Sequence, residues 1–264
     1  MALERDTERA AQLILQAHHA VALTGAGHST PSGIPDFRSP GSGLWEKANP
    51  MVVASIFAFR LQPQAFYDWI RPLAKLMLEA KPNPAHHALA ELEEMGLLQA
   101  VITQNIDGLH QAAGSHRVLE LHGHMREATC VRCYKVVPAQ PLINRFLEDG
   151  QMPLCDQCGG VMKPNVILFG EQLPIAVLNE ANREAELCDL MLVAGSSLEV
   201  SPAANLPFIA YQHGAKLIIV NYQDTYLDAQ AAVVIHADVA EVLPCIVEKV
   251  KEGVSVNVTV PLPE

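Results

Sequence analysis

Two CxxC pairs are the most specific chemical signal in this sequence of 264 residues. Cys130 and Cys133 form the first pair, and Cys155 and Cys158 form the second. Two intervening residues let both sulfurs of a pair face one ion, and two such pairs complete a tetrahedral shell with no open position. The spacing therefore predicts a structural zinc site. A redox dithiol is the weaker alternative.

A glycine-rich turn follows the apolar run 20–23. Its sequence, TGAGHST over residues 24–30, resembles a phosphate-binding turn because glycines let a backbone approach a pyrophosphate closely. Thr30 stands where the strict dinucleotide fingerprint has a third glycine, so an ordinary tight turn is the alternative. The turn continues into SGIPDFR over residues 32–38, a loop that builds little core and is typical of a binding segment.

Polar residues also follow three other short apolar runs. TQNIDGLH (103–110), GSS (195–197) and Asn221 each come directly or almost directly after such a run. In open α/β sheets, ligands bind at the carboxyl ends of the strands, so we expect these sets to meet at one edge. An ordinary helix cap is the alternative for Asp107.

The segment LHGH over residues 121–124 supplies the candidate general base. A histidine beside glycine in a loop leaves room for a substrate and titrates near neutral pH. Spacing alone does not separate His122 from His124, and an ordinary surface or core histidine is the alternative for both. His86 and most other histidines lack such a context and are expected to be ordinary.

The elements that must position these groups alternate between helical patterns and short runs rich in Val, Ile and Leu. This alternation is typical of an α/β fold with a doubly wound parallel sheet. Two stretches interrupt it, an aromatic-rich helical module over about 36–82 and a zinc module over about 128–163. The valine alternation over 255–264 predicts an edge strand or a tail. We expect helices over 5–18, 84–95 and 173–187, and strands over 20–23, 98–102, 190–193, 217–220 and 231–235.

The composition excludes several classes of protein. Half of the residues are hydrophobic and 18% are charged, which excludes wholesale disorder. No apolar run reaches 18 residues and the start is charged, so we expect neither a membrane span nor an export signal. A net charge of −11 argues against nucleic acid as a partner. Six cysteines in such a chain favour the reducing cytoplasm, with Cys188 and Cys245 as inert core residues.

Taken together, the motifs resemble those of sirtuins, which are NAD-dependent protein lysine deacylases. GAGHSTPSGIPDFR, TQNIDGLH, LHG, the two CxxC pairs, KPNVILFGE and GSSLEVSPA occur in the family's order. His28 departs from the family pattern, which generally has an aliphatic residue there. The resemblance implies a Rossmann-like large domain over about 1–35, 83–127 and 164–264, and a small domain made of the two modules. NAD and an acylated lysine of a protein or peptide would enter the cleft between them from opposite sides.

The resemblance also implies a role for each matching residue in transfer of the acyl group to ADP-ribose with release of nicotinamide. His122, rather than His124, matches the general base, and Asn105 and Asp107 match residues that position the ribose and the carboxamide. Mono-ADP-ribosyl transfer and a non-catalytic NAD or zinc-binding module are the alternatives. The implied cofactor-binding residues are Gly25, Ala26, Gly27, Gly33, Ile34, Asp36, Phe37, Arg38, Gln104, Asn105, Ile106, Asp107, His122, Gly195, Ser196, Ser197, Asn221 and Val239. The implied substrate-binding residues are Tyr67, Ile70, Val166, Phe169, Gly170 and Glu199.

The segment FYDWIR over residues 66–71 bears on the choice of acyl group. Sirtuins that favour acidic acyl groups carry a Tyr and, three residues later, an Arg that pairs with the acyl carboxylate. Here Tyr67 is present but Ile70 holds the arginine position, and on a helix Arg71 is turned from it by about 100°. Pro72 biases Arg71 away from helical geometry. We expect acetyl and other neutral groups to be preferred over succinyl or malonyl.

Overall fold

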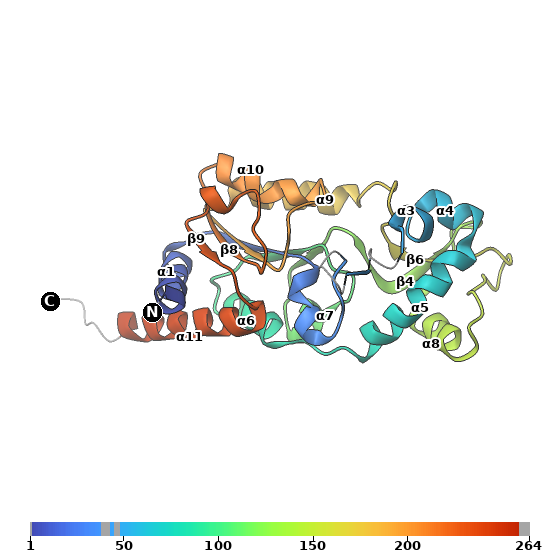
Figure 1. Cartoon of the computed structure of the whole chain (residues 1–264), viewed down its shortest axis with the longest axis horizontal. Coiled ribbons are helices and arrows are strands. Elements are labelled where there is room, and N and C mark those ends of the chain that lie inside the picture. The colour runs from blue at the N-terminus through green and yellow to red at the C-terminus, as the bar shows by residue number, and fades with distance from the viewer. Residues whose placement is uncertain (1, 38–42, 45–47, 259–264) are drawn as a thin grey trace.

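A six-stranded parallel sheet forms the centre of the larger part of the molecule (Figure 1). The computed structural model describes residues 2–37, 43–44 and 48–258. The strand order is β3-β2-β1-β7-β8-β9, so the direction of winding reverses between β1 and β7. Loops that leave the carboxyl ends of these two central strands therefore lie next to each other. The strands are β1 (Ala20–Thr24), β2 (Ala100–Thr103), β3 (Val118–Glu120), β7 (Leu190–Ala194), β8 (Lys216–Val220) and β9 (Val233–Ile235).

Helices cover both faces of this sheet, which explains why its central strands are apolar throughout. Every residue of β1 and β7 is buried, and their side chains alternate between two separate core clusters. One face packs against α1 (Ala2–Gln16), α6 (Pro84–Glu94) and α11 (Val239–Val258), and the other against α9 (Ile175–Leu187) and α10 (Leu206–Gln212) (Figure 1). The doubly wound α/β prediction is confirmed.

The two interruptions of the alternation pack together as one smaller unit at the other end of the molecule (Figure 1). Its antiparallel sheet has the order β5-β4-β6 and extends beyond the expected zinc module on both sides. Rings from both interruptions meet in its core, where Tyr67 lies edge-on to Phe146 at 5.1 Å. The elements are α3 (Pro50–Val53), α4 (Ile56–Leu61), α5 (Pro63–Glu79), β4 (Gly123–Cys130), β5 (Val136–Pro138), α8 (Gln140–Asp149) and β6 (Met162–Val166).

Two sequence expectations are wrong near the C-terminal end. Helix α11 continues to Val258, so residues 255–258 are helical rather than an edge strand. The reason is that α11 packs along α1, close enough that a Cβ on Gly253 would lie 2.5 Å from Leu15. Cys245 is exposed on the same helix, so it is not a core residue, whereas Cys188 is buried. Within the described ranges, none of the helices combines the length and apolarity that a membrane span requires.

Candidate active site

A cleft of about 570 Å³ lies at the carboxyl edge of the large sheet, where the smaller unit meets it. Loops that follow β1, β2, β7 and β8 supply one wall, which is rich in glycine and polar side chains. Helix α5 and the segment 166–173 supply the other wall, which is mainly apolar. The predicted polar sets therefore do meet at one edge of the sheet, opposite residues from both interruptions.

The loops after β1 and β7 touch through glycines. The Gly27 N–H donates to the Gly195 carbonyl at 2.9 Å. A Cβ on Gly25 would lie 2.8 Å from that carbonyl oxygen, and a Cβ on Gly195 would lie 2.2 Å from the His28 nitrogen. Gly195 also has φ of +64°, which side chains disfavour. The backbones of Gly25, Gly27 and Gly195 therefore form a polar surface without side chains, the glycine floor of the cleft, which fits the pyrophosphate of a dinucleotide.

Asn105, Ser29 and Asp107 form a hydrogen-bonded group above this floor. The Asn105 amide donates to the Gly25 carbonyl at 2.9 Å and to the Ser29 hydroxyl oxygen at 3.0 Å. Ser29 in turn donates to the Asp107 carboxylate at 2.7 Å. Burial raises the pKa of Asp107, and hydrogen bonds from the Leu109 N–H and from Ser29 oppose that shift. The group holds a carboxylate and an amide in fixed positions at the cleft.

Gln104 joins three parts of the polar wall. Its backbone N–H donates to the Thr24 carbonyl at 3.0 Å, and its side-chain amide donates to the Ser196 hydroxyl at 2.9 Å. Its carbonyl oxygen lies 2.9 Å from His122 Nδ1. The end of β2 is thereby connected to β1, to the loop after β7 and to the candidate base.

The contact with Gln104 defines the protonation state of His122. A carbonyl oxygen only accepts, so Nδ1 carries the proton and Nε2 carries a lone pair. Burial lowers the pKa of His122, and the hydrogen bond to Gln104 opposes that shift. His122 is therefore neutral at pH 7 and able to accept a proton at Nε2. His124 is outside the cleft lining.

Gly123 explains why the histidine motif has its particular form. Its φ is +74°, and a Cβ there would lie 2.0 Å from the Asn165 carbonyl oxygen. This close pairing of β4 with β6 lets the Ile167 N–H donate to the His122 carbonyl at 2.8 Å. The glycine therefore places the base beside Val166 and Ile167, at the start of the apolar wall.

Helix α5 turns one face toward the cleft. Phe66, Trp69, Ile70, Leu73 and Met77 follow helical spacing and all line it. The opposite face of α5 packs on the smaller unit's own sheet and on α8. The face on which a residue lies therefore decides whether it reaches the cavity, and this applies to the segment 66–71 that bears on the choice of acyl group.

Tyr67 and Arg71 lie on the face of α5 that turns away from the cleft. The Tyr67 hydroxyl donates to the Met162 carbonyl, and burial raises the pKa of this phenol. The Arg71 guanidinium donates to the Leu147 carbonyl at 2.8 Å and lies 5.8 Å from the centre of the Phe146 ring. Both side chains therefore connect α5 to neighbouring elements, while Ile70 lines the cavity.

Most of the residues that the sequence singled out for the cofactor and substrate line this one cleft. Three do not. Gly33 ends a short 3₁₀ turn beside it, Tyr67 faces the other way, and Val239 is buried at the start of α11. Arg38 lies outside the described residues. Those that line the cleft are Gly25, Ala26, Gly27, Ile34, Asp36, Phe37, Ile70, Gln104, Asn105, Ile106, Asp107, His122, Val166, Phe169, Gly170, Gly195, Ser196, Ser197, Glu199 and Asn221.

Several residues that line the cleft have no role predicted from the sequence. Ser29 belongs to the glycine-rich motif but was not assigned a role, although it links Asn105 to Asp107. The spacing of Phe66, Trp69, Leu73 and Met77 could have identified the apolar face of α5. Tyr222 and Gln223 follow Asn221 in the loop after β8 and also line the cleft.

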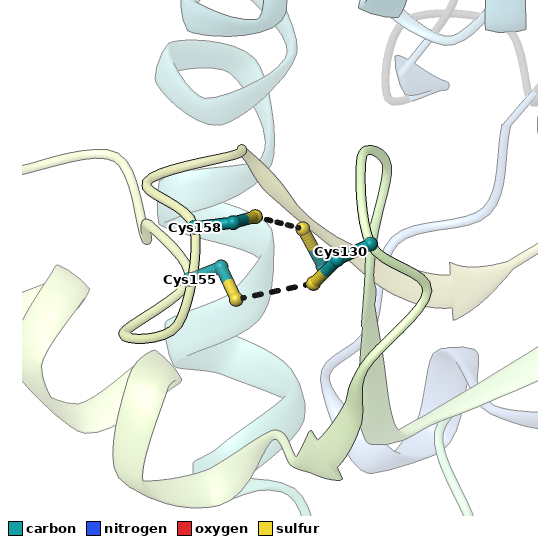
Figure 2. Close-up of side chains that lie close together, drawn as sticks. Cys130, Cys155 and Cys158 are labelled. Carbon is teal, nitrogen blue, oxygen red and sulfur yellow. Dashed lines mark hydrogen bonds between the residues drawn. The ribbon is translucent and has the colours of Figure 1, made fainter.

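The four cysteines converge in the smaller unit (Figure 2). The sulfurs of Cys130 and Cys158 are 3.4 Å apart, and those of Cys133 and Cys155 are 3.7 Å apart. A tetrahedral zinc ion with Zn–S bonds of about 2.3 Å requires sulfurs about 3.8 Å apart. The donor set therefore fits zinc, and because it is closed and none of the four cysteines lines the cleft, the role of the metal is structural.

Comparisons with known proteins agree with this site. A model of the Sir2 family matches residues 25–202. NAD-dependent protein deacylase 2 of Archaeoglobus fulgidus is 50% identical over 250 residues, which is 94% of this chain and 98% of that protein. A solved structure from work on the mechanism and regulation of Sir2 enzymes superposes with a TM-score of 0.89 at 49% identity, covering 94% of this chain and 99% of the other. The structure of Sir2Af2 bound to a myristoylated histone peptide superposes with a TM-score of 0.82 at 44% identity, covering 96% and 99%.

Proposed function

Because the chain belongs to the Sir2 family, we propose that its cleft performs NAD-dependent removal of acyl groups from protein lysines, with His122 as the general base. The observation that carries the assignment is the tautomer of His122. Its Nδ1–H is held by the Gln104 carbonyl, which leaves the Nε2 lone pair available in the cleft that Asn105 and Asp107 also line. NAD, when bound, supplies an activated ribose carbon that releases nicotinamide and an ADP-ribose that receives the acyl group.

The polar wall would hold the dinucleotide. The glycine floor offers backbone contacts to the pyrophosphate, while Ser196 and Asn221 offer side chains at the ends of the neighbouring strands. Asn105 and Asp107 would position the ribose and the carboxamide, because both are fixed by Ser29 before any ligand arrives. His122 would accept a ribose hydroxyl proton at Nε2, and its lowered pKa keeps that atom unprotonated at pH 7.

The apolar wall would hold the acyl-lysine. Val166, Phe169 and Gly170 lie where β6 leads away from His122, and Ile70 faces them from α5. Glu199 lies in the segment that would pair with the substrate backbone as an added strand. Among the described residues, α5 places no cationic side chain in this wall, since Ile70 lines the cavity and Arg71 is turned toward α8. We propose neutral acyl groups, from acetyl to longer chains, as the preferred substrates, and the Sir2Af2 complex with a myristoylated peptide supports the longer ones.

A nicotinamide-release assay tests this function. The protein is incubated with NAD and a peptide that contains one acetyl-lysine, and the matched control is the same peptide without the acetyl group. The expected result is nicotinamide release with the acetylated peptide alone, together with unmodified lysine and acetylated ADP-ribose by mass spectrometry. A peptide that gains ADP-ribose instead would establish the transferase alternative, and no release would establish a non-catalytic module.

We further propose that the protein works in the cytoplasm. The six cysteines are free in the structure, and four of them form a thiolate shell that oxidation would destroy. Cell fractionation with an antibody against the chain would test the proposal, and recovery outside the cytoplasmic fraction would contradict it.

A further inference from the structure

Three histidines meet beneath the glycine-rich loop, outside the cleft. His28 lies in the 3₁₀ turn η1 (Ala26–His28), His86 in α6 and His110 in α7 (Leu109–Ala113). Their ring centres are 4.6, 4.8 and 5.0 Å apart, and their side chains are 0 to 1% exposed. One nitrogen from each ring lies within 4.8 Å of the others. Three segments distant in the sequence thus bring imidazoles to one buried point.

Four of the six ring nitrogens in this cluster have no hydrogen-bond partner among the described residues. They are both nitrogens of His28, Nε2 of His86 and Nδ1 of His110. The other two are engaged, because His110 Nε2 lies 2.9 Å from the Thr24 hydroxyl and His86 Nδ1 accepts a long hydrogen bond of 3.3 Å from the Asn83 N–H. Buried polar atoms normally have partners, so the unpartnered nitrogens indicate a ligand.

The cluster has the charge state that a metal requires. Burial lowers the pKa of His86 to about 3 and that of His110 to about 4. Burial, followed by the His110 and His86 imidazoles, lowers the pKa of His28 well below 6.5. All three rings are therefore neutral at pH 7. Neutral imidazole is the form that binds zinc, copper, nickel and cobalt ions.

We propose that His28, His86 and His110 form a second metal site, for a divalent first-row transition metal ion held by three imidazoles. A tetrahedral ion with M–N bonds of 2.0–2.1 Å requires nitrogens about 3.4 Å apart, so each nitrogen must move inward by no more than about 1 Å. His110 is already oriented by Thr24, as metal-bound histidines usually are by a second partner. Binding at His86 Nε2 moves the ring proton to Nδ1, so the long hydrogen bond from the Asn83 N–H to Nδ1 is given up when the metal binds.

The ion would cross-link the loop that forms the floor of the cleft to two helices. His28 lies between Gly27 and Ser29, both of which line the cleft, and its carbonyl accepts a hydrogen bond of 2.8 Å from Asn83. Metal binding is expected to raise the melting temperature and to restrict this loop. Because the cluster is buried, uptake requires the loop to open and is expected to be slow. The site stands independently of the proposed deacylation.

Cobalt titration of the zinc-loaded, full-length protein tests the proposal. Co²⁺ bound by nitrogen gives visible absorption without the thiolate charge-transfer bands that a cysteine site would add. The expected result is one equivalent of Co²⁺ per chain in addition to one zinc. His28→Leu should lose the whole second equivalent and keep the zinc. His86→Gln, which keeps an acceptor for the Asn83 N–H, should lose it as well.

His87→Gln is the matched control, because His87 is the exposed neighbour of His86 on the same helix. It should bind the second equivalent as the unaltered protein does. The proposal is overturned if the unaltered protein takes up no second equivalent after prolonged incubation. It is equally overturned if folded His28→Leu and His86→Gln proteins, verified by circular dichroism, retain that equivalent, or if His87→Gln loses it.

Discussion

The two walls of the cleft are built in opposite ways. The wall at the sheet edge consists of backbone and short polar side chains that hydrogen-bond across loops, as in the link from Asn105 through Ser29 to Asp107. The wall of the smaller unit consists of large apolar side chains on one face of α5. The first construction fixes individual atoms, while the second fixes a volume. Each wall therefore suits a different task. The polar wall orients the reacting atoms, and the apolar wall selects an acyl chain by its size and polarity.

The largest effect is expected from loss of the metal that holds the apolar wall. Cys158→Ser should release zinc and unfold the smaller unit, because a structural zinc site contributes roughly 10–16 kcal/mol. Activity should disappear, and metal analysis with limited proteolysis would measure both changes. Cys245→Ser, at an exposed cysteine far from the shell, is the control and should leave zinc content and activity unchanged. Full activity in zinc-free Cys158→Ser would show that the wall needs no metal.

The next largest effect concerns a single atom of the polar wall. His122→Ala removes the proton acceptor at Nε2 and should reduce kcat roughly 10²–10⁴-fold, with the melting temperature almost unchanged. Steady-state deacetylation kinetics would measure the loss. His124→Ala is the matched control two residues away and should remain active. The reverse pattern would assign the base to His124.

A smaller effect should follow from the apolar wall's lack of a cation. A buried carboxylate at Ile70 would have no partner, and a charge-assisted hydrogen bond contributes about 1.5–3 kcal/mol. The value of kcat/KM should therefore be roughly 10–100-fold higher for an acetyl than for a succinyl peptide of the same sequence. Ile70→Arg should lower this acetyl-to-succinyl ratio of kcat/KM, because the added guanidinium can pair with the succinyl carboxylate. A native preference for succinyl would mean that Arg71 leaves Leu147 and reaches the cavity.

The smallest effect is a shift in pH dependence. Burial lowers the pKa of His122 below 6.5, and the base works only when it is neutral. Activity should therefore be full at pH 7 and should decline only below the ordinary histidine pKa. A profile of kcat/KM against pH, corrected for acid unfolding, measures the pH at which this decline in activity occurs. A midpoint above 6.5 would show that a bound anion, rather than burial, controls the histidine.

The sequence predicted the sheet and its polar edge better than it predicted the apolar wall. Strands such as β7 are buried on both faces, so their composition alone identifies them. Polar residues that follow such strands must meet, because parallel carboxyl ends share one edge. Which face of α5 turns toward the cleft is decided by tertiary packing rather than by the local sequence. Tyr67 was expected in the cleft, but its hydroxyl finds a partner in Met162, and no local pattern encodes that contact.

The cluster of His28, His86 and His110 shows the same limit. Each residue alone looks like an ordinary histidine, and their sequence separations carry no ligand spacing of the kind that CxxC supplies. Only the packing of the 3₁₀ turn η1 against α6 and α7 brings them together. Local motifs therefore reveal sites made by one turn, whereas sites shared among distant segments require the fold.

The pairing of β1 with β7 at the centre of the sheet has a consequence for how the chain folds. Ala20 pairs with Leu190, so β1 must wait for most of the chain to be synthesised before its second edge is covered. Until then, an apolar strand with unpaired backbone groups is exposed, which is the arrangement that invites aggregation. Folding dominated by such long-range pairing is slow. Strand β7 thus completes the pairing of a strand that was made long before it, and shortened chains that lack β7 would be expected to expose that edge to chaperones.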